Sequence, residues 1–135
     1  MSAHTILFLN QKGGVGKTTS VVNLGSALAR MGHRVLLIDL DSQANMTSAL
    51  ALERVGHTIY HVIAAAVPVR EAIKETSVKN LYAIASDINM AGLNIELVDQ
   101  DRREFFLKEA LQGIEGEWDF ILVDCPPSLG LVPIN

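Results

Sequence analysis

The sequence predicts an α/β fold in which helices flank a mostly parallel sheet. Two observations lead to this fold class. Four short apolar runs have the composition of buried strands, and segments with helical spacing of apolar residues separate them. A strand, a helix and a second strand with short connections form a right-handed parallel unit. We therefore expect a single domain over residues 1–135, with a sheet of about four strands.

The first expected strand–helix–strand unit occupies the N-terminal part of the chain. Residues 5–9 form a short apolar run that ends at loop residues, as a buried strand does. Residues 18–31 have helical periodicity, and Gly32 suits the position just after a helix C-terminus. The apolar run within residues 34–39 predicts the second strand. The helix face expected to be buried consists of Val21, Leu24, Leu28 and Met31.

The rest of the chain continues the alternation of helices and strands. Pro68 interrupts the apolar residues of 58–76, so we expect two short helices there. In residues 101–113, helical spacing predicts a helix whose buried face consists of Leu107, Ala110, Leu111 and Ile114. The other expected elements are a partly helical segment at 42–54, a strand at 81–85, a weakly helical segment at 89–99 and a strand at 120–123.

Composition and charge restrict the class of protein. Hydrophobic residues make up 49% of the chain and charged residues 19%, which is typical of a globular protein. The net charge of −4 gives no overall basic surface for nucleic acid. The one cysteine, Cys125, excludes an internal disulfide. The sequence has neither an apolar stretch of the roughly 20 residues that a membrane span needs nor a signal peptide, so we expect a cytoplasmic protein.

A glycine-rich segment lies between the first expected strand and the first expected helix. Its glycines allow backbone N–H groups to converge on phosphate oxygens without interference from a Cβ atom. Lys17 would place a positive charge on the outer phosphates, and Thr18 would offer a hydroxyl to Mg²⁺. The segment therefore predicts a site for a nucleoside triphosphate with magnesium. The predicted binding residues are Lys12, Gly13, Gly14, Val15, Gly16, Lys17, Thr18 and Thr19.

Three aspartates follow predicted strands, at the edge of a parallel sheet where ligands bind. Asp124 closes the last strand and would hold Mg²⁺ directly or through water; the alternative is a carboxylate that caps a turn. Asp39 and Asp41 end the second strand. One would support the Mg²⁺ site and the other would orient the attacking water; the alternative is a solvated turn with Ser42.

Lys12 has two interpretations. A lysine ahead of the glycines has no assigned phosphate in an isolated binding loop, so it is either a solvated surface charge or a residue with a partner elsewhere. In the second case it would reach a nucleotide bound to another subunit and stabilise charge that develops during phosphoryl transfer.

The glycine-rich segment reads KGGVGKTT and resembles the deviant Walker A motif of the ParA/MinD ATPases. Two further motifs are similar to those of the ParA, or Soj, branch of this family. Residues 35–45 read VLLIDLDSQAN, and residues 124–130 read DCPPSLG. The three motifs occur in the family's order, and the resemblance covers the whole chain.

The resemblance implies a P-loop NTPase-like fold and an ATP hydrolase (ATPase) activity that depends on Mg²⁺. Members of the family are ATP-dependent homodimers that act in plasmid or chromosome partitioning, with two ATP molecules held between two subunits. A ParB-like partner stimulates hydrolysis, and the ATP-bound dimer binds DNA without sequence preference. These properties imply a cytoplasmic protein that associates with the nucleoid and not with a membrane.

The resemblance also implies a role for each site residue. Lys12 would be the lysine that crosses the dimer interface, and Lys17 the lysine that binds phosphate. Asp41 would activate the attacking water, so the implied catalytic residues are Lys12, Lys17 and Asp41. The implied metal-site residues are Thr18, Asp124 and, behind the direct ligands, Asp39.

The chain departs from the family pattern in three places. Ser42 stands where the family usually has proline, and Ala44 where it usually has glycine. Family members continue well beyond the third motif, with further strands and DNA-contacting residues, whereas this sequence ends at Asn135. We expect an incomplete sheet with an open edge that promotes self-association, including domain swapping. We also expect a lower nucleotide affinity than in longer relatives.

Two other functions remain open on the sequence. One is a nucleotide-binding assembly module that dimerises without hydrolysing ATP. The other is a MinD-like positioning ATPase, which would need a C-terminal amphipathic helix.

Several other residues receive structural interpretations. His57 and His61 lie four apart, but a metal site needs a third ligand and none is evident nearby. Arg102, Arg103 and Lys108 are expected on a solvated helix face rather than in a basic patch. The aromatic residues expected in the core are Phe105, Phe106, Trp118 and Phe120.

Overall fold

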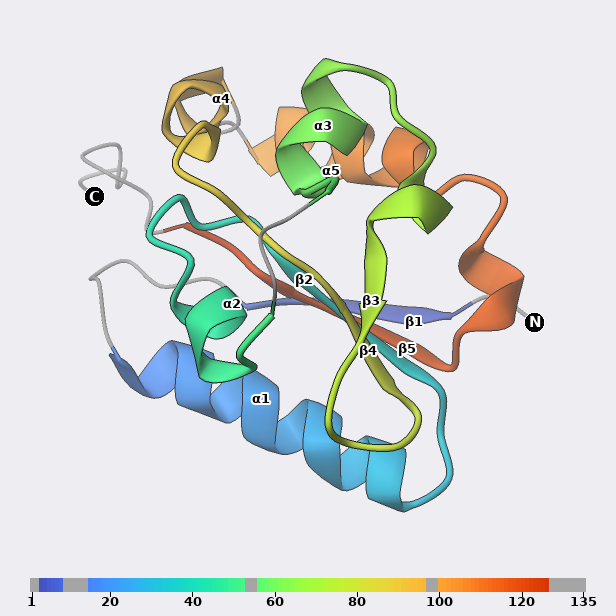
Figure 1. Cartoon of the computed structure of the whole chain (residues 1–135). Coiled ribbons are helices and arrows are strands. Elements are labelled where there is room, and N and C mark those ends of the chain that lie inside the picture. Colours follow the sequence, from blue (N-terminus) through green and yellow to red (C-terminus); the bar gives the residue numbers. More distant parts are fainter. Residues whose placement is uncertain (1–2, 9–14, 53–55, 97–99, 127–135) are drawn as a thin grey trace, which may run out of the picture.

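The computed structural model describes residues 3–8, 15–52, 56–96 and 100–126. In these residues the chain forms one sheet with the strand order β1-β5-β2-β4-β3 (Figure 1). β1, β5, β2 and β4 are parallel, and β3 is antiparallel to β4 at one edge. The α/β fold with a mostly parallel sheet is therefore confirmed, although the sheet has five strands and not four. The strands are β1 (His4–Phe8), β2 (Val35–Asp39), β3 (Ile73–Glu75), β4 (Leu81–Ile84) and β5 (Phe120–Asp124).

Helices cover both faces of the sheet. α1 and α2 lie on one face, and α3, α4 and α5 lie on the other (Figure 1). None of the helices in the described ranges is long and apolar enough to cross a membrane. The helices are α1 (Val15–Arg30), α2 (Asn45–Ala49), α3 (Ile59–Ala64), α4 (Met90–Glu96) and α5 (Gln100–Ala110), with the 3₁₀ turns η1 (Val69–Ala72) and η2 (Glu115–Glu117).

β3 is the element that differs most from the sequence prediction. The two short helices expected in residues 58–76 are present as α3 and η1, but the chain then leaves η1 and forms a strand. Ile73, Lys74 and Glu75 carry no alternation of apolar and polar residues long enough to indicate a strand. β3 forms because Ile73 lies opposite Ile84 in the neighbouring strand, so tertiary pairing decides its conformation.

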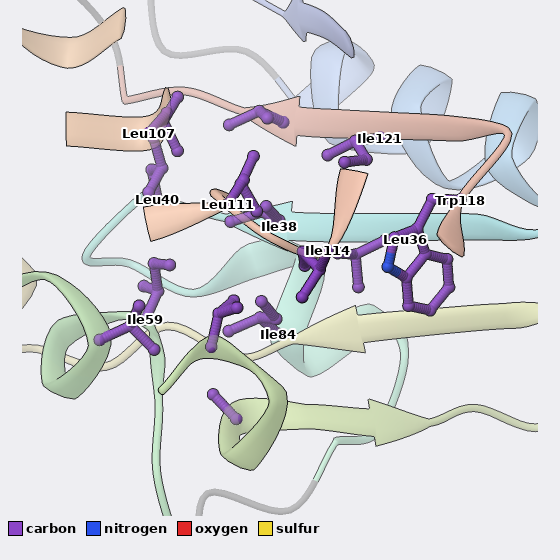
Figure 2. Close-up of a cluster of buried hydrophobic side chains, with 14 of the residues drawn as sticks. Leu36, Ile38, Leu40, Ile59, Ile84, Leu107, Leu111, Ile114, Trp118 and Ile121 are labelled. Atoms are coloured by element: carbon purple, nitrogen blue, oxygen red, sulfur yellow. The ribbon is translucent and has the colours of Figure 1, made fainter. Parts of the chain in front are cut away.

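The larger core cluster fills the space between the sheet and helices α3 and α5 (Figure 2). Leu36 and Ile38 of β2 belong to it, whereas Val35 and Leu37 belong to the cluster on the opposite face, as alternation along a strand requires. The predicted buried face of residues 101–113 is confirmed: its members Leu107, Leu111 and Ile114 are buried and Ala110 packs against them. Of the aromatic residues, Trp118 is buried as expected, but Phe105 is 59% exposed.

The face of α1 that its periodicity suggested is buried only in part: Val21 is fully buried and Leu28 packs against the core, and small residues make the rest of the contact with the sheet. Gly25 and Ala29 are buried, whereas Leu24 is 38% and Met31 72% exposed. A Cβ atom on Gly25 would lie 2.8 Å from the Leu37 Cδ2 atom, so the helix backbone lies directly against the side chains of the sheet. The close approach rotates the expected face of α1 partly into solvent.

The strand register aligns the ends of three neighbouring strands. Phe8 of β1 pairs with Asp124 of β5, and Asp124 in turn pairs with Asp39 of β2. The predicted binding segment directly follows β1, and α1 returns beneath the sheet from the same end. The fold therefore brings the glycine-rich connection and two aspartates to one edge of the sheet, the carboxyl edge.

Candidate functional site

Lys17 and Asp124 form a buried ion pair at the carboxyl edge. Lys17 lies in the first turn of α1, and its Nζ atom is 2.7 Å from Oδ1 of Asp124. The two side chains are only 10% and 1% exposed. The Lys17 ammonium also donates a hydrogen bond to the carbonyl oxygen of Cys125. These contacts hold a positive charge beside the point where β1 runs into the predicted binding segment.

Thr18 contacts the second oxygen of the same carboxylate. Its Oγ1 atom donates to Oδ2 of Asp124 over 3.0 Å, and both residues are buried. A hydroxyl and a carboxylate oxygen at this separation are hard oxygen ligands of the kind that Mg²⁺ takes. They also lie at the N-terminus of α1, where the helix dipole favours anions. The site therefore offers oxygen ligands for a cation and a positive environment for phosphate.

Asp39 is fully buried, and other groups of the chain occupy both of its carboxylate oxygens. Oδ1 accepts a hydrogen bond of 3.0 Å from the backbone N–H of Asp41. Oδ2 accepts from the backbone N–H of Thr47 over 3.0 Å and from the Thr47 hydroxyl over 2.7 Å. Burial raises the pKa of Asp39 from its ordinary value of 3.8 to about 6; these hydrogen bonds lower it, and the charge of Asp124 raises it.

Asp41 lies just beyond β2 in a tight turn and is half-buried. Its Oδ1 atom accepts a hydrogen bond of 3.0 Å from the N–H of Gln43, and its carbonyl oxygen accepts one from the N–H of Ala44. Ala44 has φ 57°, a left-handed conformation that glycine adopts more readily. A turn thus follows β2, but it is not the solvated turn considered as the alternative for both aspartates, because Asp39 is fully buried.

Some of the predicted site residues can be placed and others cannot. The structure brings Lys17, Thr18 and Asp124 into direct contact and pairs Asp39 with Asp124 across the sheet. Asp41 lies close to Asp124 along the backbone, because the N–H of the preceding residue, Leu40, donates to the carbonyl oxygen of Asp124. Val15 and Gly16 begin α1, and Thr19 is exposed on it. The predicted residues that lie outside the described ranges are Lys12, Gly13 and Gly14.

Sequence reasoning missed Thr47 and Ser86. Thr47 binds Asp39, and its hydroxyl accepts a hydrogen bond of 2.9 Å from the N–H of Ser86, just after β4. Both residues are fully buried. Neither belongs to a sequence pattern that points to a site, since a threonine in a short helix and a serine after a strand are common features of loops and caps. Thr47 reaches Asp39 because α2 follows β2 closely in the chain, whereas Ser86 reaches Thr47 through the sheet order, which places β4 beside β2.

The histidine pair has a structural role in the described part of the chain. His57 lies ahead of α3, and its ring stacks edge-on against His61 at 5.4 Å. His61 completes a capping box, because its Nδ1 atom accepts a hydrogen bond from the N–H of Thr58. No cluster of three or more potential metal-ligating side chains occurs among the residues that the structure describes.

A mostly parallel sheet whose first strand is joined by a glycine-rich segment to a helix, with an aspartate at the end of the adjacent strand, defines an α/β domain of the P-loop NTPase type. Within this class, the chain belongs to the AAA_31 family, whose model is described as an AAA domain and matches residues 3–135.

Relatives and a solved structure support this assignment. The chain is 48% identical over 131 residues to the chromosome-partitioning ATPase Soj of Treponema pallidum, covering 97% of this chain and 51% of that protein. It is 49% identical to the sporulation initiation inhibitor protein Soj of Bacillus subtilis, covering 96% of this chain and 52% of the relative. Its fold matches cobyrinic acid a,c-diamide synthase from Mycobacterium smegmatis, crystallised with an ATP analogue and magnesium. For this structure the TM-score is 0.83 and the identity 36%, over 95% of this chain and 53% of the other. The chain thus spans about half the length of these proteins.

Proposed function

We propose that the chain is the nucleotide-binding portion of a ParA/Soj-type ATPase. It would bind ATP with Mg²⁺ and act as a nucleotide-dependent switch in chromosome or plasmid partitioning. The observation that carries the proposal is the convergence of Lys17 and Thr18 on Asp124 at the carboxyl edge of the sheet. The relative named as a chromosome-partitioning ATPase supports the choice of partitioning, and the solved structure with an ATP analogue and magnesium supports the choice of ligand.

The proposed nucleotide site uses the residues at the N-terminus of α1. Lys17 would exchange the Asp124 carboxylate for the outer phosphates, and the backbone N–H groups of the segment from Lys12 to Thr19 would surround the phosphate chain. Thr18 and Asp124 would hold the magnesium ion, which uses few protein ligands when phosphate and water supply the others. When bound, the ion neutralises charge on the phosphates.

Two further residues are proposed to act in hydrolysis. Asp41 would accept a hydrogen bond from the attacking water and orient it, because it lies next to the strand ends that carry Asp39 and Asp124. Lys12 would reach the nucleotide of a second subunit and stabilise charge there. Asp39 would support the metal site from behind the direct ligands.

The proposed switch would have the partners of ParA/Soj-type ATPases, namely a second subunit, an activating protein and DNA. ATP binding would favour a homodimer, a ParB-like protein would stimulate hydrolysis, and the ATP-bound dimer would bind DNA without sequence preference. A role in partitioning would place the protein in the cytoplasm, at the nucleoid. The open sheet edge adds a second route to self-association, including strand exchange.

Nucleotide binding and phosphate release test the proposal together. Lys17→Ala is expected to weaken binding of a fluorescent ATP analogue by at least roughly tenfold, since it removes the cation that meets the phosphates. Lys79→Ala alters an exposed lysine and serves as the matched control. Asp41→Ala is expected to preserve binding and to reduce phosphate release by roughly 100-fold or more.

Two outcomes would contradict the proposal. Equal binding by wild type, Lys17→Ala and Lys79→Ala would exclude the site at α1. Equal phosphate release near background by wild type and Asp41→Ala would favour the non-hydrolysing assembly module instead.

A further inference from the structure

Three fully buried residues, one of them through its backbone N–H, form a hydrogen-bonded group behind the proposed site. They are Asp39 at the end of β2, Thr47 in α2 and Ser86 after β4. The Thr47 hydroxyl donates to Asp39 Oδ2 over 2.7 Å and accepts from the N–H of Ser86 over 2.9 Å. A single hydroxyl, used both as donor and as acceptor, therefore links two strand ends to the helix that follows Asp41.

The Asp39 carboxylate connects Thr47 to Asp41, because each of its oxygens accepts hydrogen bonds from one of these two residues. Its Oδ2 atom accepts two hydrogen bonds from Thr47, one from the hydroxyl and one from the backbone N–H at 3.0 Å. Its Oδ1 atom accepts the N–H of Asp41 over 3.0 Å. Because a carboxylate is planar, fixing one oxygen also fixes the direction of the other. The position of the Asp41 backbone thus depends on the contacts that Thr47 makes.

We propose that Thr47 is a positioning residue whose hydroxyl holds the Asp39 carboxylate in the orientation that places Asp41 at the site. Thr47 does not touch the nucleotide in this arrangement; it acts through Asp39. The consequence for hydrolysis rests on the proposed function of Asp41, whereas the consequence for the Asp41 backbone does not.

The chain offers matched variants for a test. Thr47→Val keeps the shape of the side chain and removes both hydrogen bonds of the hydroxyl, whereas Thr47→Ser retains them. Ser86→Ala removes a second buried hydroxyl from the same place. Among the described residues that hydroxyl has no hydrogen-bond partner, and its removal leaves the backbone N–H that binds Thr47. A general effect of altering this buried region would appear in Ser86→Ala as well.

The first measurement uses the nucleotide-free protein. Amide hydrogen exchange, followed by NMR, reports how firmly the Asp41 N–H is held by Asp39. Thr47→Val is expected to raise the exchange rate of this amide by at least roughly tenfold, while Thr47→Ser and Ser86→Ala stay within about twofold of wild type. Unchanged protection of Asp41 in Thr47→Val would overturn the proposal.

The second measurement separates kcat from KM for ATP hydrolysis. Misplacing a group that orients the reactants lowers kcat, so Thr47→Val is expected to lose roughly 10- to 100-fold in kcat. KM for ATP should stay within about twofold, because Thr47 does not touch the proposed phosphate site of Lys17 or the proposed magnesium site of Thr18, and Thr47→Ser should keep the kcat of wild type. Loss of kcat in Ser86→Ala equal to that in Thr47→Val would overturn the proposal.

Two remaining outcomes are also decisive. If Thr47→Val does not fold, wild type supplies the test: the amides of Asp41, Thr47 and Ser86 should be protected together, and free exchange of Asp41 beside a protected Thr47 would overturn the proposal. If wild type hydrolyses no ATP while Thr47→Val releases the Asp41 amide, the positioning role stands and the proposed function fails.

Discussion

Asp39 shows how the interior sets the properties of a single carboxylate. It is fully buried, and three hydrogen bonds from Asp41 and Thr47 favour its charged form. Burial outweighs these bonds and the nearby charge of Asp124 adds to it, so the pKa of Asp39 rises to about 6. The ionised carboxylate at neutral pH therefore costs the folded protein stability.

This cost predicts a specific pH dependence of folding. Because the pKa of Asp39 is higher in the folded than in the unfolded chain, its stabilising contribution is complete below pH about 4 and is lost as pH rises through about 6. By pH 7 the loss amounts to about 3 kcal/mol. Asp39→Asn lacks this loss. In urea unfolding without magnesium, the unfolding free energy of the variant should therefore rise relative to that of wild type between pH 4 and 7.

A control and a contradicting result define this experiment. Glu109→Gln changes an exposed carboxylate on α5 and tests for effects of net charge alone. A difference in unfolding free energy between wild type and Asp39→Asn that stays constant from pH 4 to 7 would show that the folded protein does not hold Asp39 as described.

At the scale of elements, α1 shows why a helix face is harder to predict than a helix. α1 ends at Arg30, one residue before the predicted end, and Gly32 beyond it has the φ of 94° typical of a residue after a helix C-terminus, but α1 begins three residues earlier than predicted. Its buried face agrees only in part: Val21 is buried, whereas Leu24 and Met31 are exposed and the backbone at Gly25 lies against the sheet instead. Two helical glycines with opposite surroundings allow this packing to be tested.

Substitution of each glycine by alanine should change stability in opposite directions. A Cβ at Gly25 meets two buried leucines, at 2.8 Å from Leu37 and 3.3 Å from Leu81, so Gly25→Ala is expected to destabilise by about 1–2 kcal/mol. Nothing lies within 4 Å of a Cβ at Gly92 in α4, so Gly92→Ala should stabilise by about 0.5–1 kcal/mol. Chemical unfolding measures both; stabilisation by Gly25→Ala would refute the close packing.

Elements with a local sequence pattern could be predicted from the sequence, whereas elements that depend on tertiary contacts could not. β2 and β5 are fully or almost fully buried and thus apolar up to their terminal aspartates, which makes them easy to recognise. Leu107 in α5 and Leu111 just after it lie one turn apart in the core, as helical spacing predicts, although α5 itself ends at Ala110. β3 depends on pairing with β4, and Ser86 reaches Thr47 only through the sheet order, so neither left a local signal.

At the scale of the whole molecule, β1 is the outermost strand on one side of the sheet that the described residues form. In the described ranges β1 pairs only with β5, and β1 is exposed over most of its length. The N–H of His4 and the carbonyl oxygen of Phe8 bond toward β5, so the alternate residues Thr5 and Leu7 direct theirs away from it. These outward groups form a template for another strand.

We expect this edge to cause self-association that a single proline abolishes. Thr5→Pro removes an outward N–H without removing a bond to β5, whereas Thr5→Val keeps the N–H and serves as the control. Light scattering should show a molar mass that rises with concentration for wild type and Thr5→Val, and a monomer for Thr5→Pro. A monomer at every concentration for wild type, or equal association by Thr5→Pro, would refute the role of the edge.

The place of β5 between β1 and β2 has a consequence for biosynthesis. Residues 4 and 120 are neighbours in the sheet, and the strand that joins the two halves of the site is the last one described. On the ribosome, the proposed phosphate-binding segment is therefore made early but lacks Asp124 until β5 leaves the exit tunnel and inserts between strands already made. Pairing so distant in sequence forms slowly. A growing polypeptide would therefore not complete the proposed nucleotide site before its synthesis had passed Asp124.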